Sequence, residues 1–175
     1  MEKEFSRRSF LKMGTTAAAA MAVSPSLLMG KEKKVKKAAP QPLDRKLKIL
    51  GVGIGGRGAS VLKGLETEEI IGLCDVDWKY AAHIFKRYPN AKRYNDYRVM
   101  FKEMLDEADA VVVATADHTH AIIAAEAIAA GKHVYVEKPL THTVYESRLL
   151  TKLAAKHKVA TQMGNQGASE EGVRL

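Results

Sequence analysis

The chain of 175 residues is long enough for one well-buried domain and too short for two of ordinary size. Its hydrophobic share of 46% and charged share of 27% are those of a globular protein, which excludes a largely disordered chain. The formal charge of +8 is uneven, because residues 1–46 carry 11 Lys and Arg against 4 Asp and Glu, whereas residues 47–175 carry 17 against 16. The basic excess belongs to the N-terminal segment, so the charge does not predict a nucleic-acid partner.

The N-terminal 30 residues have the features of an export signal. The motif SRRSFLK at residues 6–12 precedes a modestly apolar, alanine-rich run at 13–29. This resembles a twin-arginine signal, so we expect the protein to engage the twin-arginine export machinery and to reach the periplasm. The Ser-Pro-Ser break at 24–26 argues against a permanent membrane span. Residues 31–45 are Lys-rich with two prolines and are predicted to form a disordered linker.

The apolar run at 47–51 predicts a strand that ends in a glycine cluster and passes into a helix at 57–65. Gly51, Gly53 and Gly56 fit the spacing GxGxxG. In a dinucleotide site the first glycine allows the turn, the second lets the backbone approach a pyrophosphate, and the third lets the helix pack on the strand. The helix N-terminus would then face the phosphates.

A second apolar run at 70–74 contains the only cysteine, Cys74, as a small core residue, and ends in Asp75, 24 residues after Gly51. An acid at this place binds the two ribose hydroxyls of the NAD adenosine and repels a 2′-phosphate, so NAD is favoured over NADP. The alternative is that Asp75 is only a strand-end cap or turn residue. The following segment, 77–88, predicts a helix with Tyr80, Ile84, Phe85 and Tyr88 toward the core.

Strands at 93–94, 109–114, 133–136 and 159–163 alternate with helices at 96–106, 118–130 and 143–157. The strand at 109–114 is apolar throughout, as expected when helices cover both faces of a sheet. Six strands with helical crossovers predict an α/β fold, a doubly wound parallel sheet of Rossmann type in the order 3-2-1-4-5-6, over residues 46–166.

Three polar clusters follow the last three strands and would meet at the carboxyl edge of the sheet, where such folds bind ligands. Residues 115–120 contain two histidines and a carboxylate. We predict no metal site there, because no third ligand cluster exists and residues two apart at a helix start point away from each other. Asp117 is interpreted as a helix N-cap, with His118 or His120 turned toward the cofactor.

Lys138 follows the fifth strand and offers a cation that could bind a substrate hydroxyl or carbonyl oxygen and ease its proton transfer. Pro139 would fix the backbone after it, with either peptide isomer. The alternative for Glu137 and Lys138 is a solvated loop pair.

Together these motifs resemble the Gfo/Idh/MocA superfamily, the glucose-fructose oxidoreductase and inositol dehydrogenase relatives. The resemblance covers residues 46–175 and rests on the glycine motif, CDVD at 74–77, NDYR at 95–98, TxDHxH at 115–120, AGKHV at 130–134 and EKP at 137–139. It implies that Lys138 helps to build the catalytic site, where we also expect His120. The cofactor-binding residues expected from motif and resemblance are Gly51, Gly53, Ile54, Gly55, Gly56, Arg57, Asp75, Thr115, Asp117, His118, His120, Glu137, Lys138, Asn165 and Gln166.

The resemblance also implies a sugar or polyol substrate and a homo-oligomer for the full-length form. Relatives continue into a second, α+β domain that supplies further active-site residues, and residues 167–175 would only begin it. Three functions therefore stay open: a dehydrogenase, a glycosidase in which NAD oxidises the sugar transiently before elimination, and a nucleotide-binding fragment without activity.

Overall fold

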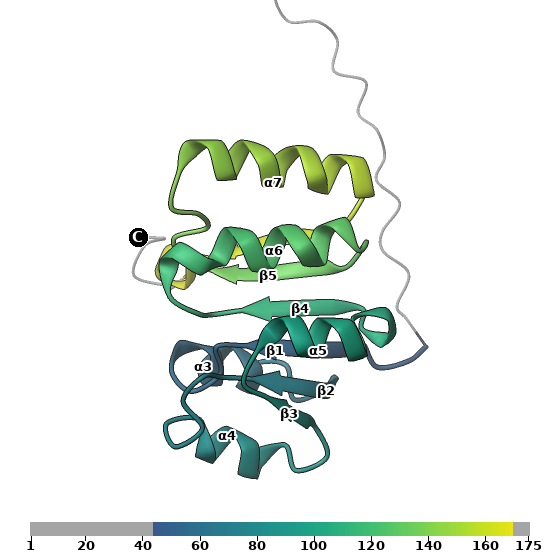
Figure 1. The fold of residues 1–175 in the computed structure, drawn as a ribbon, viewed down its shortest axis with the longest axis vertical. Helices are drawn as coiled ribbons and strands as arrows, with labels where there is room; N and C mark the ends of the chain where they lie inside the picture. The colour runs from purple at the N-terminus through teal and green to yellow at the C-terminus, as the bar shows by residue number, and fades with distance from the viewer. Residues whose placement is uncertain (1–43, 170–175) are drawn as a thin grey trace, which may run out of the picture. The chain divides into compact units, whose positions relative to one another are not determined.

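The computed structural model describes residues 44–169, which form a parallel sheet with helices on both sides (Figure 1). The predicted signal, nearly all of the linker and residues 170–175 lie outside this range. The six strands follow the order β3-β2-β1-β4-β5-β6, and every neighbouring pair is parallel. This confirms the predicted fold. The strands are β1 (Lys48–Val52), β2 (Glu69–Cys74), β3 (Lys92–Tyr94), β4 (Ala110–Val113), β5 (His133–Glu137) and β6 (Thr161–Gly164).

Residues 44–169 contain five α-helices and three short 3-10 helices, and local side chains fix several of their ends. The Asp96 carboxylate accepts from the Arg98 amide at the start of α5, and Thr143 and Glu146 form a capping box at the start of α7. The helices are α3 (Arg57–Lys63), α4 (Ala82–Arg87), α5 (Tyr97–Met104), α6 (His120–Ala129) and α7 (Val144–His157), with η1 (Leu105–Glu107), η2 (Asp117–Thr119) and η3 (Gln166–Ser169).

The helix predicted at 77–88 is shorter than expected. Asp77 Oδ1 accepts hydrogen bonds from the amides of Lys79 and Tyr80, both at 3.0 Å, which stabilises a turn and delays the start of α4 to Ala82. The predicted core position of Tyr80 is therefore wrong, since its side chain is 61% exposed. Ile84 and Phe85 are buried, as predicted.

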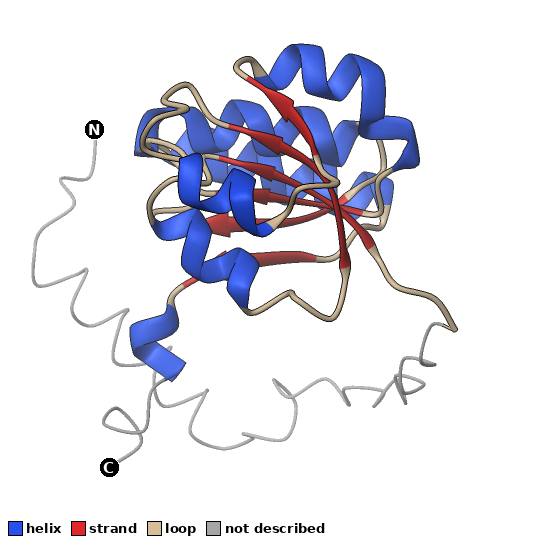
Figure 2. Cartoon of the chain, turned by 90° about the horizontal axis from the view of Figure 1, so that it is seen from below, coloured by secondary structure: helices blue, strands red, loops and turns tan. Residues whose placement is uncertain are grey.

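One face of the sheet is covered by α5, α6 and α7. Their apolar side chains pack on alternate residues of the central strands in one continuous core cluster. The β5 residues Val134 and Val136 point into this core and are 5% and 0% exposed. Figure 2 shows the strands lying between helices on both sides. Burial on this face is the main source of hydrophobic stabilisation.

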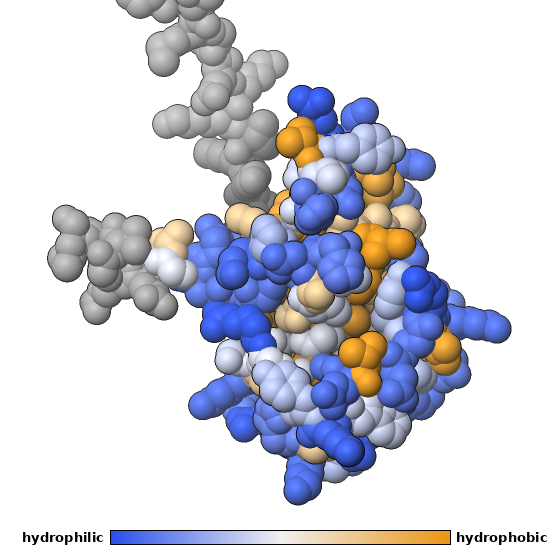
Figure 3. All heavy atoms as spheres, turned by 60° about the vertical axis from the view of Figure 1, so that its left-hand side comes forward, coloured by the Kyte–Doolittle hydropathy of each residue, from blue (hydrophilic) through white to orange (hydrophobic). Residues whose placement is uncertain are grey.

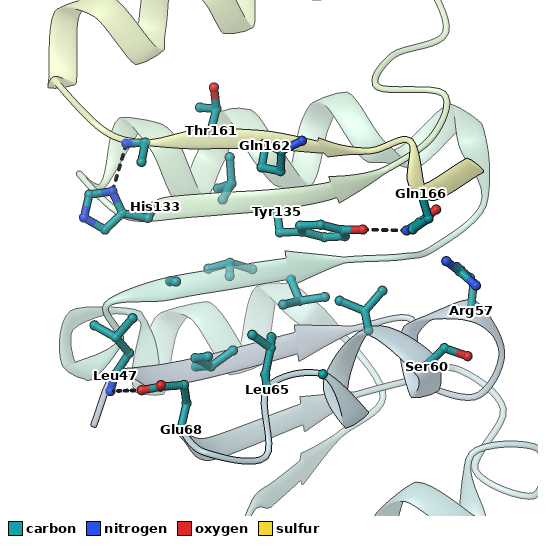
Figure 4. Close-up of a pocket in the computed structure, with 18 residues that line it drawn as sticks. Leu47, Arg57, Ser60, Leu65, Glu68, His133, Tyr135, Thr161, Gln162 and Gln166 are labelled. Atoms are coloured by element: carbon teal, nitrogen blue, oxygen red, sulfur yellow. Dashed lines mark hydrogen bonds between the residues drawn. The ribbon is translucent and has the colours of Figure 1, made fainter. Parts of the chain in front are cut away.

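On the opposite face the helices within residues 44–169 are α3 and α4, which pack on β1 and β2 in a second cluster. Beside α3 a trough of about 640 Å³ runs over β4, β5 and β6. Figure 4 shows Leu65 on its α3 side, Tyr135 on its floor, and Glu68 accepting from the Leu47 amide at one end. This face of β4, β5 and β6 therefore carries much less helical packing than the other.

Hydrophobic residues are also exposed among charged ones on the side where the carboxyl ends of the strands emerge (Figure 3). Within residues 44–169, no helix is long and apolar enough to cross a bilayer.

Candidate cofactor site

The turn after β1 can be made only by glycine at its centre. Gly53 has a φ of +77°, and a Cβ there would lie 2.6 Å from the carbonyl oxygen of Ala114 and the amide of Thr115. Its own amide donates to the Cys74 carbonyl at 2.9 Å. The missing side chain at Gly53 thus lets the ends of β1, β2 and β4 meet closely at the carboxyl edge.

The glycine that lets the helix pack tightly is Gly58 rather than Gly56. A Cβ at Gly58 would lie 2.2 Å from the Gly53 carbonyl oxygen, whereas one at Gly56 would meet only the side chain of Tyr80, its hydroxyl at 3.2 Å. The sequence carried a signal for this, since a glycine inside a helix costs stability unless close packing requires it.

Asp75 lies at the end of β2 and holds the glycine turn. Its Oδ2 accepts from the Gly55 amide at 2.8 Å, and its Oδ1 accepts from the Asp77 amide at 3.0 Å. The turn-residue interpretation is therefore part of its role. Each carboxylate oxygen has a second acceptor position, so the contacts leave capacity for ribose hydroxyls.

A cavity of about 680 Å³ lies between these loops, and its size suits part of a dinucleotide. It brings together four of the predicted cofactor residues, which are Gly53, Gly56, Asp75 and Thr115. Glu137, Lys138, His118 and Asn165 do not line it. Arg57 and Gln166 line the trough instead.

The segment after β4 forms the 3-10 turn η2 before α6 begins at His120. The predicted N-cap role of Asp117 is wrong, because its side chain makes no capping bond and its backbone carbonyl accepts from the His120 amide. His118 is exposed on the turn. The Thr119 hydroxyl lies 2.7 Å from both the Thr115 hydroxyl and the Ala116 carbonyl oxygen, which holds the turn in place.

His120 points inward, and its side chain is only 1% exposed. Its Nδ1 lies 2.7 Å from the Pro139 carbonyl oxygen, and its Nε2 lies 3.0 Å from the Thr115 carbonyl oxygen. This geometry does not support the expected direct contact with cofactor or substrate, because both ring nitrogens face the protein's own backbone. Spacing alone could not show which of the two histidines would turn inward.

Glu137 at the end of β5 is 4% exposed, so the solvated-pair alternative is wrong for this residue. Its carboxylate faces Arg57 Nε at 3.3 Å and accepts from the Gln166 side-chain amide and the Tyr135 hydroxyl. Figure 4 shows Tyr135 and Gln166 in contact, with Arg57 on α3 nearby. Burial, together with the Glu137 charge, raises the pKa of the Tyr135 phenol, which keeps it a proton donor.

Lys138 is exposed and follows Glu137 directly, with a cis peptide bond to Pro139. Its amide lies 3.3 Å from Glu137 Oε2. Asn165 is exposed and pairs through its backbone with Met163 and Ala168. Among residues 44–169, no group of three or more His, Cys, Asp or Glu side chains is placed to hold a metal ion.

Residues 46–165 match the family described as "Oxidoreductase family, NAD-binding Rossmann fold", and residues 4–24 match the twin-arginine translocation pathway signal. A glycosyl hydrolase family 109 protein of Shewanella pealeana is 29% identical over 161 residues, 82% of this chain. An inositol 2-dehydrogenase of Salmonella typhimurium is 28% identical over 127 residues, 69% of this chain. The chain spans 35% and 37% of these two relatives, about a third of their length.

Among solved structures, GenD2 from gentamicin A biosynthesis in complex with NAD is 30% identical, with a TM-score of 0.61. The alignment covers 73% of this chain and 37% of GenD2. The likeness therefore involves the same N-terminal portion in sequence and in structure.

Proposed function

Because the chain belongs to the Gfo/Idh/MocA oxidoreductase family and carries its NAD-binding Rossmann domain, we propose that the complete protein transfers a hydride between a sugar or polyol hydroxyl and NAD. The observation that carries this proposal is the meeting of the glycine turn, Asp75 and the Glu137-Lys138 pair along one edge of the sheet. The inositol dehydrogenase relative supports a polyol or sugar as the substrate class.

The first half of the sheet binds the adenosine part in this proposal. Gly53 allows the pyrophosphate to approach the backbone, and Asp75 accepts from the ribose hydroxyls. Asp77 and Asp96 line the same cavity. Their negative charges favour NAD over NADP, because a 2′-phosphate would enter an acidic environment.

The second half of the sheet carries the chemistry. NAD supplies the hydride acceptor when bound. The exposed Lys138 ammonium donates a hydrogen bond to the substrate oxygen, and it stabilises the negative charge that develops there as the hydroxyl proton passes to solvent and the hydride to NAD. Glu137 is buried and hydrogen-bonded, so it holds the backbone beside Lys138 and does not act on substrate.

A redox-assisted glycosidase is the second candidate. The observation that favours it is the Shewanella relative, whose match extends over 82% of the chain against 69% for the inositol dehydrogenase. The same cofactor half would serve both reactions. Net NADH formation with a polyol or sugar supports the dehydrogenase, whereas cleavage of an aryl glycoside without net NADH formation supports the glycosidase.

NAD binding by isothermal calorimetry tests the site in the 175-residue chain. We expect Asp75→Ala to weaken NAD binding by about tenfold, since a charged hydrogen bond to the ribose is lost. Lys138→Ala should bind NAD almost as the wild type does. The exposed residues Asp106 and Lys152 provide matched controls for the same two changes. Undetectable NAD binding in a folded wild-type sample would contradict the proposal.

Export by the twin-arginine route to the periplasm is proposed on the signal match at residues 4–24. Replacing Arg7 and Arg8 together by Lys should keep the protein in the cytoplasm, because the pathway reads the arginine pair. Cell fractionation measures this. Unchanged periplasmic amounts would contradict it.

A further inference from the structure

The buried imidazole of His120 connects two loops that come from neighbouring strands. Thr115 lies two residues after the end of β4, and Pro139 lies two residues after the end of β5. His120 itself is the first residue of α6, and its ring lies with one nitrogen 2.7 Å and the other 3.0 Å from the two carbonyl oxygens. Within residues 44–169, the His120 ring is thus the side chain that pairs with both of these carbonyls.

Both partners of the ring are hydrogen-bond acceptors. A neutral imidazole carries one N–H and serves one carbonyl at a time, whereas an imidazolium serves both. In either form, removing the ring's donors would leave at least one carbonyl without its partner. Because the His120 ring is buried, the loss of its hydrogen bonds is costly. The two loops therefore depend on this side chain for their relative position.

We propose that His120 is a positioning residue that sets the place of Lys138 and of the nicotinamide half of the cofactor. The inference rests on the proposed function, because it takes the end of β5, with Lys138, as the nicotinamide side of the site. His120 does not touch the cofactor or substrate. It holds the Thr115 carbonyl and the Pro139 carbonyl together. Because Lys138 lies between β5 and Pro139, its backbone is thereby held in place, and its side chain starts from a fixed position.

The first test directly detects the hydrogen bonds from the His120 ring to the Thr115 and Pro139 carbonyls, which we call the clamp. A buried, hydrogen-bonded imidazole N–H exchanges slowly with water and gives a downfield proton signal in the NMR spectrum of the wild-type chain. We expect such a signal, and we expect His120→Gln to abolish it, which assigns it. If no slowly exchanging ring N–H belongs to His120, the clamp is overturned. This measurement does not require NAD.

The second test separates a positioning role from a merely structural one by comparing NAD with ADP, which lacks the nicotinamide half. His120→Phe keeps a ring but has no donor, and it should weaken NAD binding by about tenfold while weakening ADP binding much less. His120→Gln retains an amide donor and should restore much of the affinity for NAD. His157→Phe, the same change near the end of α7, is the control and should alter neither ligand.

Equal weakening of NAD and ADP by His120→Phe, or no weakening of either, would overturn the positioning role. If His120→Phe does not fold, His120→Asn replaces it, because its amide is too short to reach both carbonyls. A wild-type chain that shows the ring signal but binds no NAD would overturn the proposed function, while the signal itself would support the clamp.

Discussion

The two faces of the sheet are built from the same strands but are packed very differently. On one face α5, α6 and α7 cover the β-strands, and the alternate residues of β5, Val134 and Val136, are buried. On the other face α3 and α4 cover β1 and β2, and His133 and Tyr135 of β5 border the trough. A single strand therefore takes part in a closed core and in an open surface.

This difference follows from the topology. Two crossovers connect β1, β2 and β3 on one face, and three connect β3 to β6 on the other, because right-handed crossovers change face where the strand order reverses. The uncovered part of the sheet is polar as well as apolar. On β5 it presents His133 and Tyr135, whereas the covered face of the same strand presents two valines. Four comparisons follow, and the one with the largest expected effect on the free energy of unfolding comes first.

Ile128→Ala should have the largest effect. Ile128 is fully buried in α6 on the covered face, and its truncation leaves a cavity that costs about 2–5 kcal/mol. Leu65→Ala, which shortens a half-buried wall of the trough, should cost about 1 kcal/mol or less. Urea unfolding of the two variants measures the difference. Equal losses would mean that the trough wall is as well packed as the core.

Gly58→Ala tests the packing of α3 on the open face. Alanine normally favours a helix over glycine by about 1 kcal/mol. Here the added Cβ would lie 2.2 Å from the Gly53 carbonyl oxygen, so we expect a net loss of about 1–3 kcal/mol. Thermal unfolding checks the sign. Gly167→Ala is the control, since nothing lies within 4 Å of its Cβ position. A stabilised Gly58→Ala would show that the contact relaxes freely.

Asp109 links the start of β1 to β4 at the amino edge. It accepts from Arg45 at 2.6 and 2.7 Å and from the Lys48 amide at 2.8 Å. The Arg45 hydrogen bonds lower the pKa of Asp109 well below its usual range. The contribution of the Asp109 carboxylate to the free energy of unfolding is therefore present above the unfolded pKa of about 3.9. It is lost as the pH falls through the lower pKa of the folded state.

Asp109→Asn should consequently cost about 1 kcal/mol at neutral pH, after allowance for solvent screening at the exposed Arg45. The difference in free energy of unfolding between the wild type and the variant should become smaller below about pH 4. Urea unfolding from pH 3 to 7 measures it. A difference that stays constant over this range would show that the carboxylate charge has no part in the link.

Leu65→Glu tests association between copies of the chain rather than folding. An open apolar surface favours contact between copies of the chain, so the wild type should self-associate as its concentration rises. A charge on the trough wall should weaken that association several-fold. Sedimentation velocity measures it, with Val144→Glu on α7 as the control, since Val144 is 69% exposed and does not line the trough. A monomeric wild type would contradict this prediction.

The strands and their order could be predicted because buried parallel strands are short apolar runs, and the glycine turn marks the first crossover. The start of α4 could not, since it depends on how the Asp77 side chain competes for two nearby amides. The inward direction of His120 also depends on a tertiary contact with Pro139, 19 residues away. The trough was missed because an alternation of strands and helices does not by itself show how many helices share each face.

In the proposed site, Asp75 would link the choice of cofactor to the shape of the glycine turn. The carboxylate that would exclude a 2′-phosphate also tethers the Gly55 amide through Oδ2 and the Asp77 amide through Oδ1. An engineer who replaced it with a small neutral residue to admit NADP would also release both backbone amides. A change of coenzyme in this scaffold therefore requires at least two coordinated substitutions, one to admit the phosphate and another to rebuild the tether.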